Sequence, residues 1–567
     1  MNALLIHNDN LPSPLVDGFD HVIKFDIPQS KMIEYGFSFD KEAHSQLTSF
    51  LSDAQYDVIF IPFSLSRSNY LDFTGLRLGL HIRLTRSASH HNTPIVFIGL
   101  ESKEEVAKLS DYGSFLFTTG IFTTDKFCYE DLSKQYIWIC ESWKPQAQKP
   151  KLTSIEYRNF LNRVRIDPPS NYLSHHSVEN EVALMRWSEA LKCEHKLVEI
   201  KQNLSSGLYF KYILATNPTT EKITGKNYTF LTKAKVLLID DEAEKGWGAL
   251  YESLFQFSPS ITFDFFKPNS GSFSSQANVI KEAIEEINSY KPDVVLLDLR
   301  LCDVDFSENT KPDHFTGVQV LNKIKDINAG IQVVVTTASN KVDTYIASVS
   351  AETNGFVVKD GSGDPTAKIT HLRESISKAL ERSRYLKPAY DLCERAVSEI
   401  ESAAKEDDSI DEFAREFRVL VDISFIMYQR ANQGTDFSYA YLALFKSLEL
   451  ILRTFVYEDE GKWYSKYGEA IKNYKWDDSA KQYYVTNEPF YKDKPSNFQK
   501  AAALGFDKWG FERNQIRQLY YLIKGRNDFI HPEVTVSKES YKIDTPQSYT
   551  KLLKCIHDIT IAIHKCC

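Results

Sequence analysis

In the stretch Val236-Leu237-Leu238-Ile239-Asp240-Asp241, a run of aliphatic residues ends in two acids. Such a run is typical of a buried parallel strand, which delivers polar side chains to the carboxyl edge of its sheet. Three later runs end in an acid, a hydroxyl and an amine: Asp298 after 294–297, Thr337 after 333–336, and Lys359 after 356–358. We therefore expect five polar groups to meet at one edge of one sheet.

Alternating strand and helix patterns surround these residues from 231 to 386. The expected strands cover 235–239, 262–266, 293–297, 332–336 and 355–358. The expected helices cover 274–289, 315–328, 341–351 and 367–385. This alternation favours a parallel sheet with helices on both faces. The sequence thus predicts an α/β domain.

An acidic pair, a lone acid, a threonine and a lysine in this order resemble the receiver domain of two-component response regulators. The step of 22 residues from Thr337 to Lys359 is the same as in that family. The resemblance implies that Asp298 accepts a phosphoryl group from a histidine kinase, since a carboxylate is a competent nucleophile toward phosphorus. It implies that Thr337 and Lys359 bind the phosphoryl group and form the switch. It also implies a Mg²⁺ site of oxygen ligands, formed by Asp240, Asp241, Asp298 and the backbone carbonyl of Arg300.

Two features depart from the family pattern. The segment between Asp298 and Gly317 is longer than the usual loop, and Lys359 is followed by Asp360 where the family usually has proline. Both changes alter the surface around the pocket, so they bear on partner choice and phosphoryl lifetime more than on the acceptor. The alternative, for any one of these residues alone, is an ordinary polar group on the surface of an α/β domain.

Residues 1–125 repeat the same pattern without its chemistry. The matched segments are 3–8 with 236–241, 56–62 with 292–298, and 73–75 with 315–317. His7 and Asn8 replace the acidic pair, Pro62 occupies the acceptor position, and Thr118 stands where the lysine would be. We expect both α/β domains to be flavodoxin-like, with five-stranded parallel sheets, and the first to be a pseudo-receiver used for docking or dimerisation. The alternative is an unrelated α/β domain with a similar strand rhythm.

Residues 126–230 are expected to form a mostly helical connector. The apolar residues of 177–200 recur at helical spacing, whereas the apolar run 208–214 favours a strand. His175 and His176 precede the helix. They fit a phosphohistidine site, but paired histidines at a helix start are more often solvated or capping residues.

The composition of the whole chain excludes some classes of function. A formal net charge of −9 argues against general coating of nucleic acid, so any such contact needs a local basic patch. The eight cysteines are scattered without metal-binding spacing, which indicates a reducing cytosol. We find no signal peptide, no apolar run of about 18 residues, and no helix-turn-helix pattern after Leu386. We therefore expect a cytoplasmic protein without membrane contact and without a DNA-binding domain.

Residues 387–567 have a nearly continuous helical pattern, which predicts an all-α bundle. Near its end stands Gly525-Arg526-Asn527-Asp528-Phe529-Ile530-His531-Pro532. This segment resembles the motif of the HEPN superfamily, small helical domains that include many metal-independent ribonucleases. Chance produces the arginine–histidine spacing easily, and Arg86 with His91 is a second match. The asparagine after Arg526 and the helical context distinguish the C-terminal match.

The HEPN resemblance implies a ribonuclease site of Arg526, Asn527 and His531 that needs no metal and forms between two protomers of a homodimer. Pro532 disfavours helix at His531, so the imidazole can turn outward and move protons while an arginine stabilises developing charge. Residues 461–531 carry thirteen Lys/Arg, eight Asp/Glu and sixteen aromatics, which suits single-stranded RNA. The alternative is a capping or dimer-interface pair in a non-catalytic bundle.

The sequence therefore predicts four parts: pseudo-receiver (1–125), connector (126–230), phosphoacceptor receiver (231–386) and HEPN-like effector (387–567). Under one hypothesis, phosphorylation of Asp298 controls an endoribonuclease, as in anti-phage or stress defence. Under the other, the chain is a non-enzymatic adaptor whose helical domain binds a protein partner in a phosphorylation-dependent way.

Overall fold

The structure is a computed structural model that covers most of the chain. It describes residues 2–566 apart from the segments 9–18, 20, 26–35, 52–55, 67–68, 86–89, 91, 100, 125–152, 168–174, 194–205, 217–227, 270–274, 308–309, 339–352, 362, 487–489, 491–493 and 531–540. The side chains of 36–38 and 175–179 are likewise outside the description.

The N-terminal domain contains a sheet of five parallel strands in the order β2-β1-β3-β4-β5. These strands are β1 (Ala3–His7), β2 (His21–Lys24), β3 (Val58–Pro62), β4 (Ile95–Ile98) and β5 (Ile121–Thr124). The helices around it are α3 (Gly36–Leu51), α4 (Thr74–Leu84) and α5 (Lys103–Leu109). β1, β3 and β4 are buried along their whole length, because helices cover both faces of a parallel sheet.

The middle domain has a second sheet of five parallel strands, with the order β7-β6-β8-β9-β10. Its strands are β6 (Ala234–Ile239), β7 (Ile261–Phe266), β8 (Val294–Leu297), β9 (Gln332–Thr337) and β10 (Gly355–Val358). Its helices include α11 (Trp247–Phe255), α12 (Gln276–Tyr290) and α13 (Thr316–Ile327). The expected pair of five-stranded α/β domains is confirmed. The expected helix at 341–351 lies outside the described residues, and α11 was not expected, since Gly246 and Gly248 interrupt its pattern.

The two domains share a close backbone approach as well as a strand order. A Cβ atom added to Gly317, in the first turn of α13, would lie 2.2 Å from the carbonyl oxygen of Asp298. A Cβ atom added to Gly75, in the first turn of α4, would lie 1.8 Å from the carbonyl oxygen of Pro62. Any other residue would displace the end of the central strand, so glycine is needed at both positions. Pro62 therefore stands structurally where Asp298 stands in the second domain.

The connector divides between its two neighbours. Its described helices are α7 (Ser154–Arg163), α8 (His175–Leu191) and α10 (Leu208–Thr216). α7 and α10 contribute to the core of the N-terminal domain, whereas Trp187 of α8 belongs to the core of the middle domain. The strand expected at 208–214 is wrong. A short apolar run does not distinguish strand from helix, and here Leu208, Lys211 and Ala215 are buried along one helical face.

A buried polar cluster fixes α10 to the N-terminal domain. Asp40 of α3 accepts hydrogen bonds from Arg77 Nε (2.8 Å) and from the backbone N–H of Leu208 (3.0 Å), and it lies 2.9 Å from His81 Nε2. Lys211 Nζ lies 3.1 Å from His81 Nδ1. Burial alone would raise the pKa of Asp40, but His81 and Arg77 lower it to about 2. The carboxylate thus holds three segments together.

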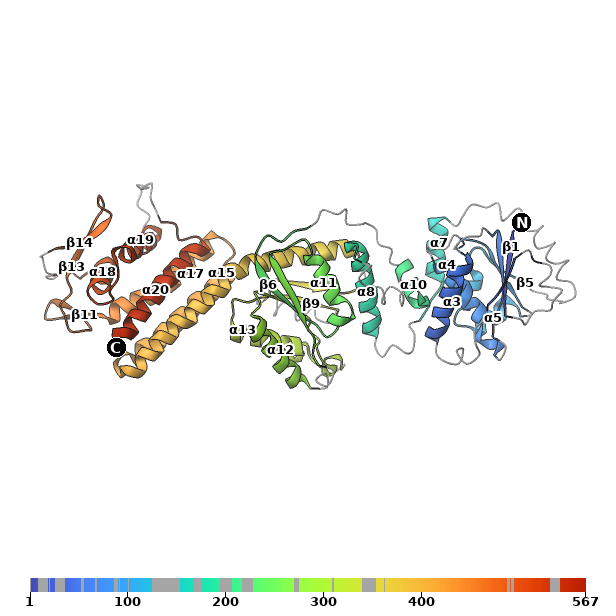
Figure 1. The fold of residues 1–567 in the computed structure, drawn as a ribbon, viewed down its shortest axis with the longest axis horizontal. Coiled ribbons are helices and arrows are strands. Elements are labelled where there is room, and N and C mark those ends of the chain that lie inside the picture. Colours follow the sequence, from blue (N-terminus) through green and yellow to red (C-terminus); the bar gives the residue numbers. More distant parts are fainter. Residues whose placement is uncertain are drawn as a thin grey trace.

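One long helix joins the middle domain to the C-terminal region. α15 (Pro365–Glu406) has 42 residues and runs through Pro388. Its first half, including Ile369 and Leu380, packs on the second sheet, and its second half enters the C-terminal core. Figure 1 shows α15 running from the sheet of the middle domain into the C-terminal helices. The domain boundary expected at 386 therefore lies within a helix, because the apolar spacing continues past it.

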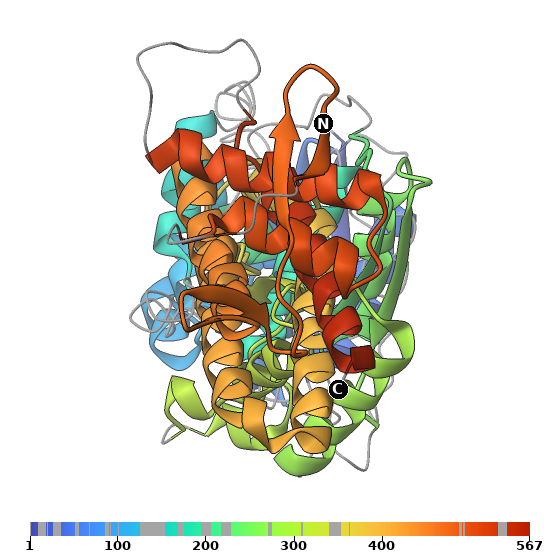
Figure 2. The same ribbon diagram turned by 90° about the vertical axis from the view of Figure 1, so that its left-hand side faces the viewer.

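The C-terminal region is mostly helical, as expected, and faces the viewer in Figure 2. Its helices are α16 (Asp411–Arg430), α17 (Gly434–Thr454), α18 (Asn497–Asp507), α19 (Arg513–Ile530) and α20 (Pro546–Cys566). Two hairpins were not expected: β11 (Val456–Asp459) with β12 (Lys462–Ser465), and β13 (Asn473–Asp477) with β14 (Gln482–Thr486). The positive φ angles of Glu460 and Gly461 suit the first tight turn. Among the described helices, none is both long and apolar enough to cross a membrane.

Candidate functional site

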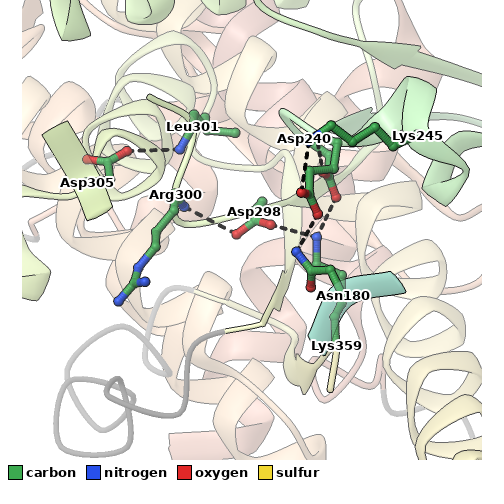
Figure 3. Close-up of polar contacts among 9 residues, drawn as sticks. Asn180, Asp240, Lys245, Asp298, Arg300, Leu301, Asp305 and Lys359 are labelled. Atoms are coloured by element: carbon green, nitrogen blue, oxygen red, sulfur yellow. Dashed lines mark hydrogen bonds and ion pairs between the residues drawn. The ribbon is translucent and has the colours of Figure 1, made fainter. Parts of the chain in front are cut away.

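Three of the expected site residues meet at the carboxyl edge of the second sheet. Lys359 Nζ donates to Asp240 Oδ2 and to Asp298 Oδ2, each at 2.6 Å. All three side chains are buried, with 0% of the Lys359 side chain exposed. Figure 3 shows the amine of Lys359 between the two carboxylates. A single cation therefore bridges two acids within the protein interior.

The strand order explains how this lysine reaches the acids. Asp298 follows β8 and Lys359 follows β10, with β9 between them. Neighbouring strands lie about 4.8 Å apart, so the flexible side chain of Lys359 crosses one strand to reach Asp298 and two to reach Asp240, which follows β6. Thr337, the last residue of β9, is fully buried on that path, and its carbonyl accepts the backbone N–H of Lys359 at 2.7 Å. The structure thus places Thr337 between the lysine and the acceptor candidate.

Asp241 completes a group of acids suited to a cation. One carboxylate oxygen from each of Asp240, Asp241 and Asp298 lies within 4.8 Å of the others. Burial raises the pKa of Asp240 to about 6 and that of Asp241 well above its ordinary value, with the neighbouring acids adding to the effect. A divalent cation would offset this cost, and three carboxylates are the hard oxygen donors that Mg²⁺ prefers. The residues present therefore fit Mg²⁺.

Arg300 lies beside these acids, two residues after Asp298. Its backbone N–H donates to Asp298 Oδ1 at 3.2 Å, and its guanidinium lies over the rings of Phe315 (5.1 Å) and Phe306 (5.6 Å). The ring contacts hold the side chain against the loop rather than in the acidic pocket. The role of its carbonyl oxygen as a metal ligand stays a prediction.

The long loop after Asp298 is ordered around one buried acid that the sequence analysis missed. The loop contains two short turns, η6 (Asp303–Phe306) and η7 (Pro312–His314). Asp305 accepts from the backbone N–H groups of Leu301 (2.9 Å) and Thr316 (2.9 Å) and from the Thr316 hydroxyl (3.0 Å). The first domain has a counterpart, since Asp72 Oδ1 accepts from both the N–H and the hydroxyl of Thr74. Both domains thus have an acid in the loop before Phe-Thr-Gly. A comparison of the two loops in the sequence could have identified Asp305 by this shared feature.

The connector helix α8 also reaches the site, which the sequence analysis did not predict. Asn180 Nδ2 donates to Glu242, whose backbone N–H donates to Asp240 Oδ1 at 2.8 Å. Figure 3 draws Asn180 together with Asp240 and Lys359. Arg186 donates to the carbonyl of Gly361 and, at 2.8 Å, to that of Gly363, in the loop after Lys359. α8 therefore contacts both loops that carry the site.

The first domain keeps the frame of this site without its reactive groups. His7 ends β1 and Asn8 follows it; both are buried, and Asn8 Nδ2 donates to the carbonyl of Leu65. Pro62 ends β3 at the acceptor position, and the Thr118 hydroxyl donates to the carbonyl of Phe115 at 2.6 Å. None of these four residues is a carboxylate or an amine, so they offer neither the aspartate acceptor nor the lysine of the second domain.

In the C-terminal region, the structure describes two of the three expected ribonuclease residues. Arg526, in the last turns of α19, donates to Glu449 Oε1 of α17 at 3.0 Å and to Asn527 Oδ1 at 3.1 Å. Its guanidinium lies 5.3 Å from the ring centre of Phe445. His531 lies outside the described residues, as do both members of the chance match, Arg86 and His91.

Many aromatics of the basic segment pack against each other. Trp476 stacks on Tyr520 with ring centres 3.8 Å apart, and Tyr474 stacks on Phe506 at 5.2 Å. Tyr484 remains 49% exposed and Phe529 42% exposed. The aromatic content of 461–531 therefore reflects packing more than a surface for stacking bases.

Two family models match this chain, one in each α/β domain. Residues 18–124 match the inactive receiver domain, and residues 265–369 match the response regulator receiver domain. Over 107 residues the chain is 28% identical to the luminescence regulatory protein LuxO of Vibrio campbellii and 29% identical to the regulatory protein LuxO of Vibrio cholerae. Each alignment covers 19% of this chain and 20% of the relative, so the chain spans about a fifth of the length of these curated relatives.

Among solved structures, the chain is similar to a two-component response regulator of the LuxR family from Aurantimonas. That similarity has 20% identity and a TM-score of 0.19, and it covers 26% of this chain and 86% of the other. The family matches show an inactive receiver domain followed by a response regulator receiver domain. Together with the LuxO relatives, they support control by phosphorylation.

Proposed function

We propose that this chain is a response regulator that accepts a phosphoryl group on Asp298 from a histidine kinase. The observation that carries the proposal is the bridge from Lys359 to Asp298 and Asp240, beside a third acid, Asp241. A structural ion pair would need one acid for one base. Here a single amine bridges two acids and a third acid lies beside them, which leaves negative charge to bind a metal ion that in turn would hold a phosphoryl group.

The proposed chemistry assigns a task to each side chain. A carboxylate oxygen of Asp298 attacks the phosphorus of a phosphohistidine, the P–N bond breaks, and the imidazole leaves with the electron pair and takes up a proton. Lys359 balances the charge of the transferred group, and the Thr337 hydroxyl donates a hydrogen bond to it. Mg²⁺, held by Asp240, Asp241 and Asp298, would supply positive charge to the phosphoryl oxygens.

The metal requirement gives the direct test of this proposal. The purified chain is incubated with a radiolabelled acyl phosphate, either with Mg²⁺ or with a chelator. We expect label to enter the protein with Mg²⁺ and not to enter it with the chelator. The bound label is an acyl phosphate, so hydroxylamine should remove it. Absence of label with Mg²⁺ present, or label that survives hydroxylamine, would contradict phosphotransfer to a carboxylate.

We further propose that the C-terminal region is a HEPN-like, metal-independent endoribonuclease of a homodimer in the cytoplasm, as in anti-phage or stress defence. In this reaction a 2′-hydroxyl attacks the adjacent phosphorus, His531 moves the proton, and Arg526 and Asn527 stabilise the developing charge. The support is the position of Arg526, which Glu449 holds half-buried near the end of α19. An oriented guanidinium is the group such a site needs.

Incubation of the purified protein with total RNA tests this second proposal. We expect cleavage that a chelator does not prevent and that Arg526→Ala slows by about a hundredfold or more. Arg517→Ala, an exposed arginine of the same helix, is the matched control and should cleave like the wild type. Equal cleavage by both variants would show a contaminating nuclease.

One observation favours the alternative of a non-enzymatic adaptor. The guanidinium of Arg526 is already paired with Glu449 and lies over Phe445, which is also the arrangement of a structural ion pair. Under this alternative, the helical region binds a protein partner when Asp298 is phosphorylated. RNA that stays intact, together with retention of a partner only after phosphorylation, would favour the adaptor.

A further inference from the structure

One helix of the C-terminal region presents apolar side chains to solvent. On α16, Val419 is 55% exposed, Ile423 and Ile426 are 47% exposed, and Met427 is 38% exposed. Single exposed apolar residues are ordinary on soluble proteins, whereas a contiguous group marks an interaction site. We name these four residues the α16 stripe.

The α16 stripe has the spacing of a helix-pairing seam. Val419, Ile423 and Ile426 are four and then three residues apart, so they form one line along the helix. The opposite face of α16, which includes Phe417 and Val421, is buried in the bundle of its own chain. α16 therefore packs inward with one face and has a second apolar face without a described partner in this chain.

Opposite charges close the two ends of this line. Glu416 precedes Val419 by three residues, and Arg430 follows Ile426 by four, so both continue the same seam. Both side chains are exposed. Glu416 also accepts from Arg453 Nη2 of α17 at 3.3 Å, which holds its carboxylate at the edge of the stripe. The sequence of the exposed seam is thus acid, three apolar residues, base.

We propose that the α16 stripe packs against the α16 stripe of a second copy of this chain, antiparallel and about a twofold axis at Ile423. In that arrangement, residues equally distant from Ile423 on either side meet. Glu416 and Arg430 are each seven residues away, so the acid of one copy meets the base of the other, twice. Val419 and Met427 are each four residues away and meet in the same manner. The interface is self-complementary, as a twofold contact requires.

The charges also exclude the parallel arrangement. Parallel helices would place Glu416 against Glu416 and Arg430 against Arg430, and like charges across an interface are unfavourable. The five seam positions and Met427 are far fewer than the roughly 20–30 residues per side of a standard interface, so we expect a reversible dimer. The α16 stripe would be the interface of the homodimer in the proposed function, and only this homodimer is taken from that proposal. Failure of the α16 contact would leave phosphotransfer at Asp298 unaffected.

Sedimentation of the full chain over a concentration series tests the apolar part of the seam. We expect a monomer–dimer equilibrium that Ile423→Asp weakens by roughly tenfold or more. Val485→Asp is the matched control, because Val485 is 49% exposed on β14 of the same region. Far-UV circular dichroism checks that both variants stay folded. A wild type that is monomeric at every concentration, or an Ile423→Asp variant that dimerises as tightly as the wild type, would overturn the proposal.

Charge reversal tests the antiparallel register separately. Glu416→Arg and Arg430→Glu should each weaken their own homodimer, because each variant brings like charges together twice. Mixed together, the two variants should form a heterodimer in preference to either homodimer, since both contacts then join an acid to a base. Glu416→Arg also loses the contact with Arg453, whereas Arg430→Glu keeps it. If both variants weaken their homodimers alike, the effect comes from the contact between copies and not from the loss of the Arg453 contact. Homodimers as tight as the wild type, with no preference for the mixed pair, would overturn this register.

Discussion

Asp298→Asn is expected to abolish the incorporation of phosphate from an acyl-phosphate donor in the presence of Mg²⁺. An amide has nearly the shape of a carboxylate but lacks its nucleophilic charge, so the acceptor is lost while the packing is kept. Lys359 retains Asp240 as a partner at 2.6 Å, and the variant should therefore remain folded. The measurement is protein-bound label after a fixed time, compared with the wild type.

The control for Asp298→Asn is Asp303→Asn, in the same loop. Asp303 is exposed, and the structure places it outside the group of acids that could bind a metal. Its replacement should leave the label at the level of the wild type. Label that persists in Asp298→Asn would move the acceptor to another residue.

Lys359→Met is expected to lower the free energy of unfolding of the middle domain by about 3–5 kcal/mol at neutral pH, because it leaves buried acids without their cation. Methionine has a similar length and no charge, so the loss of volume is small. Lys387→Met is the matched control. Lys387 forms a partly exposed ion pair with Asp293 at 2.7 Å, and such pairs contribute about 1 kcal/mol or less.

The loss in Lys359→Met should depend on pH and on Mg²⁺. Burial raises the pKa of Asp240 to about 6 in the wild type, and removing the lysine, which opposes that rise, raises the pKa further. A carboxyl group whose pKa is raised by folding destabilises the fold when it is ionised, so the penalty is full above its folded pKa and fades as the pH falls below it. Chemical denaturation should therefore show a difference from the wild type that grows above about pH 6 and is largest above the higher Asp240 pKa of the variant.

Added Mg²⁺ should recover part of the loss in Lys359→Met, since a ligand that binds only the folded state stabilises it. The same addition should change the Lys387→Met variant no more than the wild type. A stability loss in Lys359→Met that is independent of both pH and Mg²⁺ would mean that the lysine acts through packing alone.

The sequence was sufficient to predict the five strands of the middle domain and the polar residues at their ends. Asp240, Asp298 and Thr337 each follow an aliphatic run whose composition predicts a buried strand. Their place at the end of a run was therefore enough to predict that they lie at the edge of the sheet. The repeat of Phe-Thr-Gly at 73–75 and 315–317 likewise carried a structural requirement, the glycine beside a strand end. These predictions succeeded because each depends on neighbours in sequence.

What the sequence did not reveal depends on residues distant in the chain. Asn180 reaches Glu242 across 62 positions, and Arg186 reaches Gly361 across 175, and no local pattern marks either pair. Asp305 was one of many acids until the fold brought it to Thr316. The apolar run at 208–214 was misjudged because a short apolar run fits strand and helix alike, and the residue that its Lys211 contacts, His81, lies 130 positions away.

Because α15 is continuous, a movement of the helix where it packs on the receiver sheet also moves the part that packs in the C-terminal region. At 1.5 Å per residue, its 42 residues extend about 63 Å, and the half beyond the sheet acts as a lever arm of about 30 Å. A tilt of roughly 5° where α15 packs on the sheet would move its far end by between 2 and 3 Å, which is a large displacement for closely packed helices. The phase of the helix also matters, since one added residue would rotate everything beyond it by about 100°. The length of α15 thus sets how far its C-terminal end moves for a given tilt at the sheet, and its pitch sets the direction of that movement.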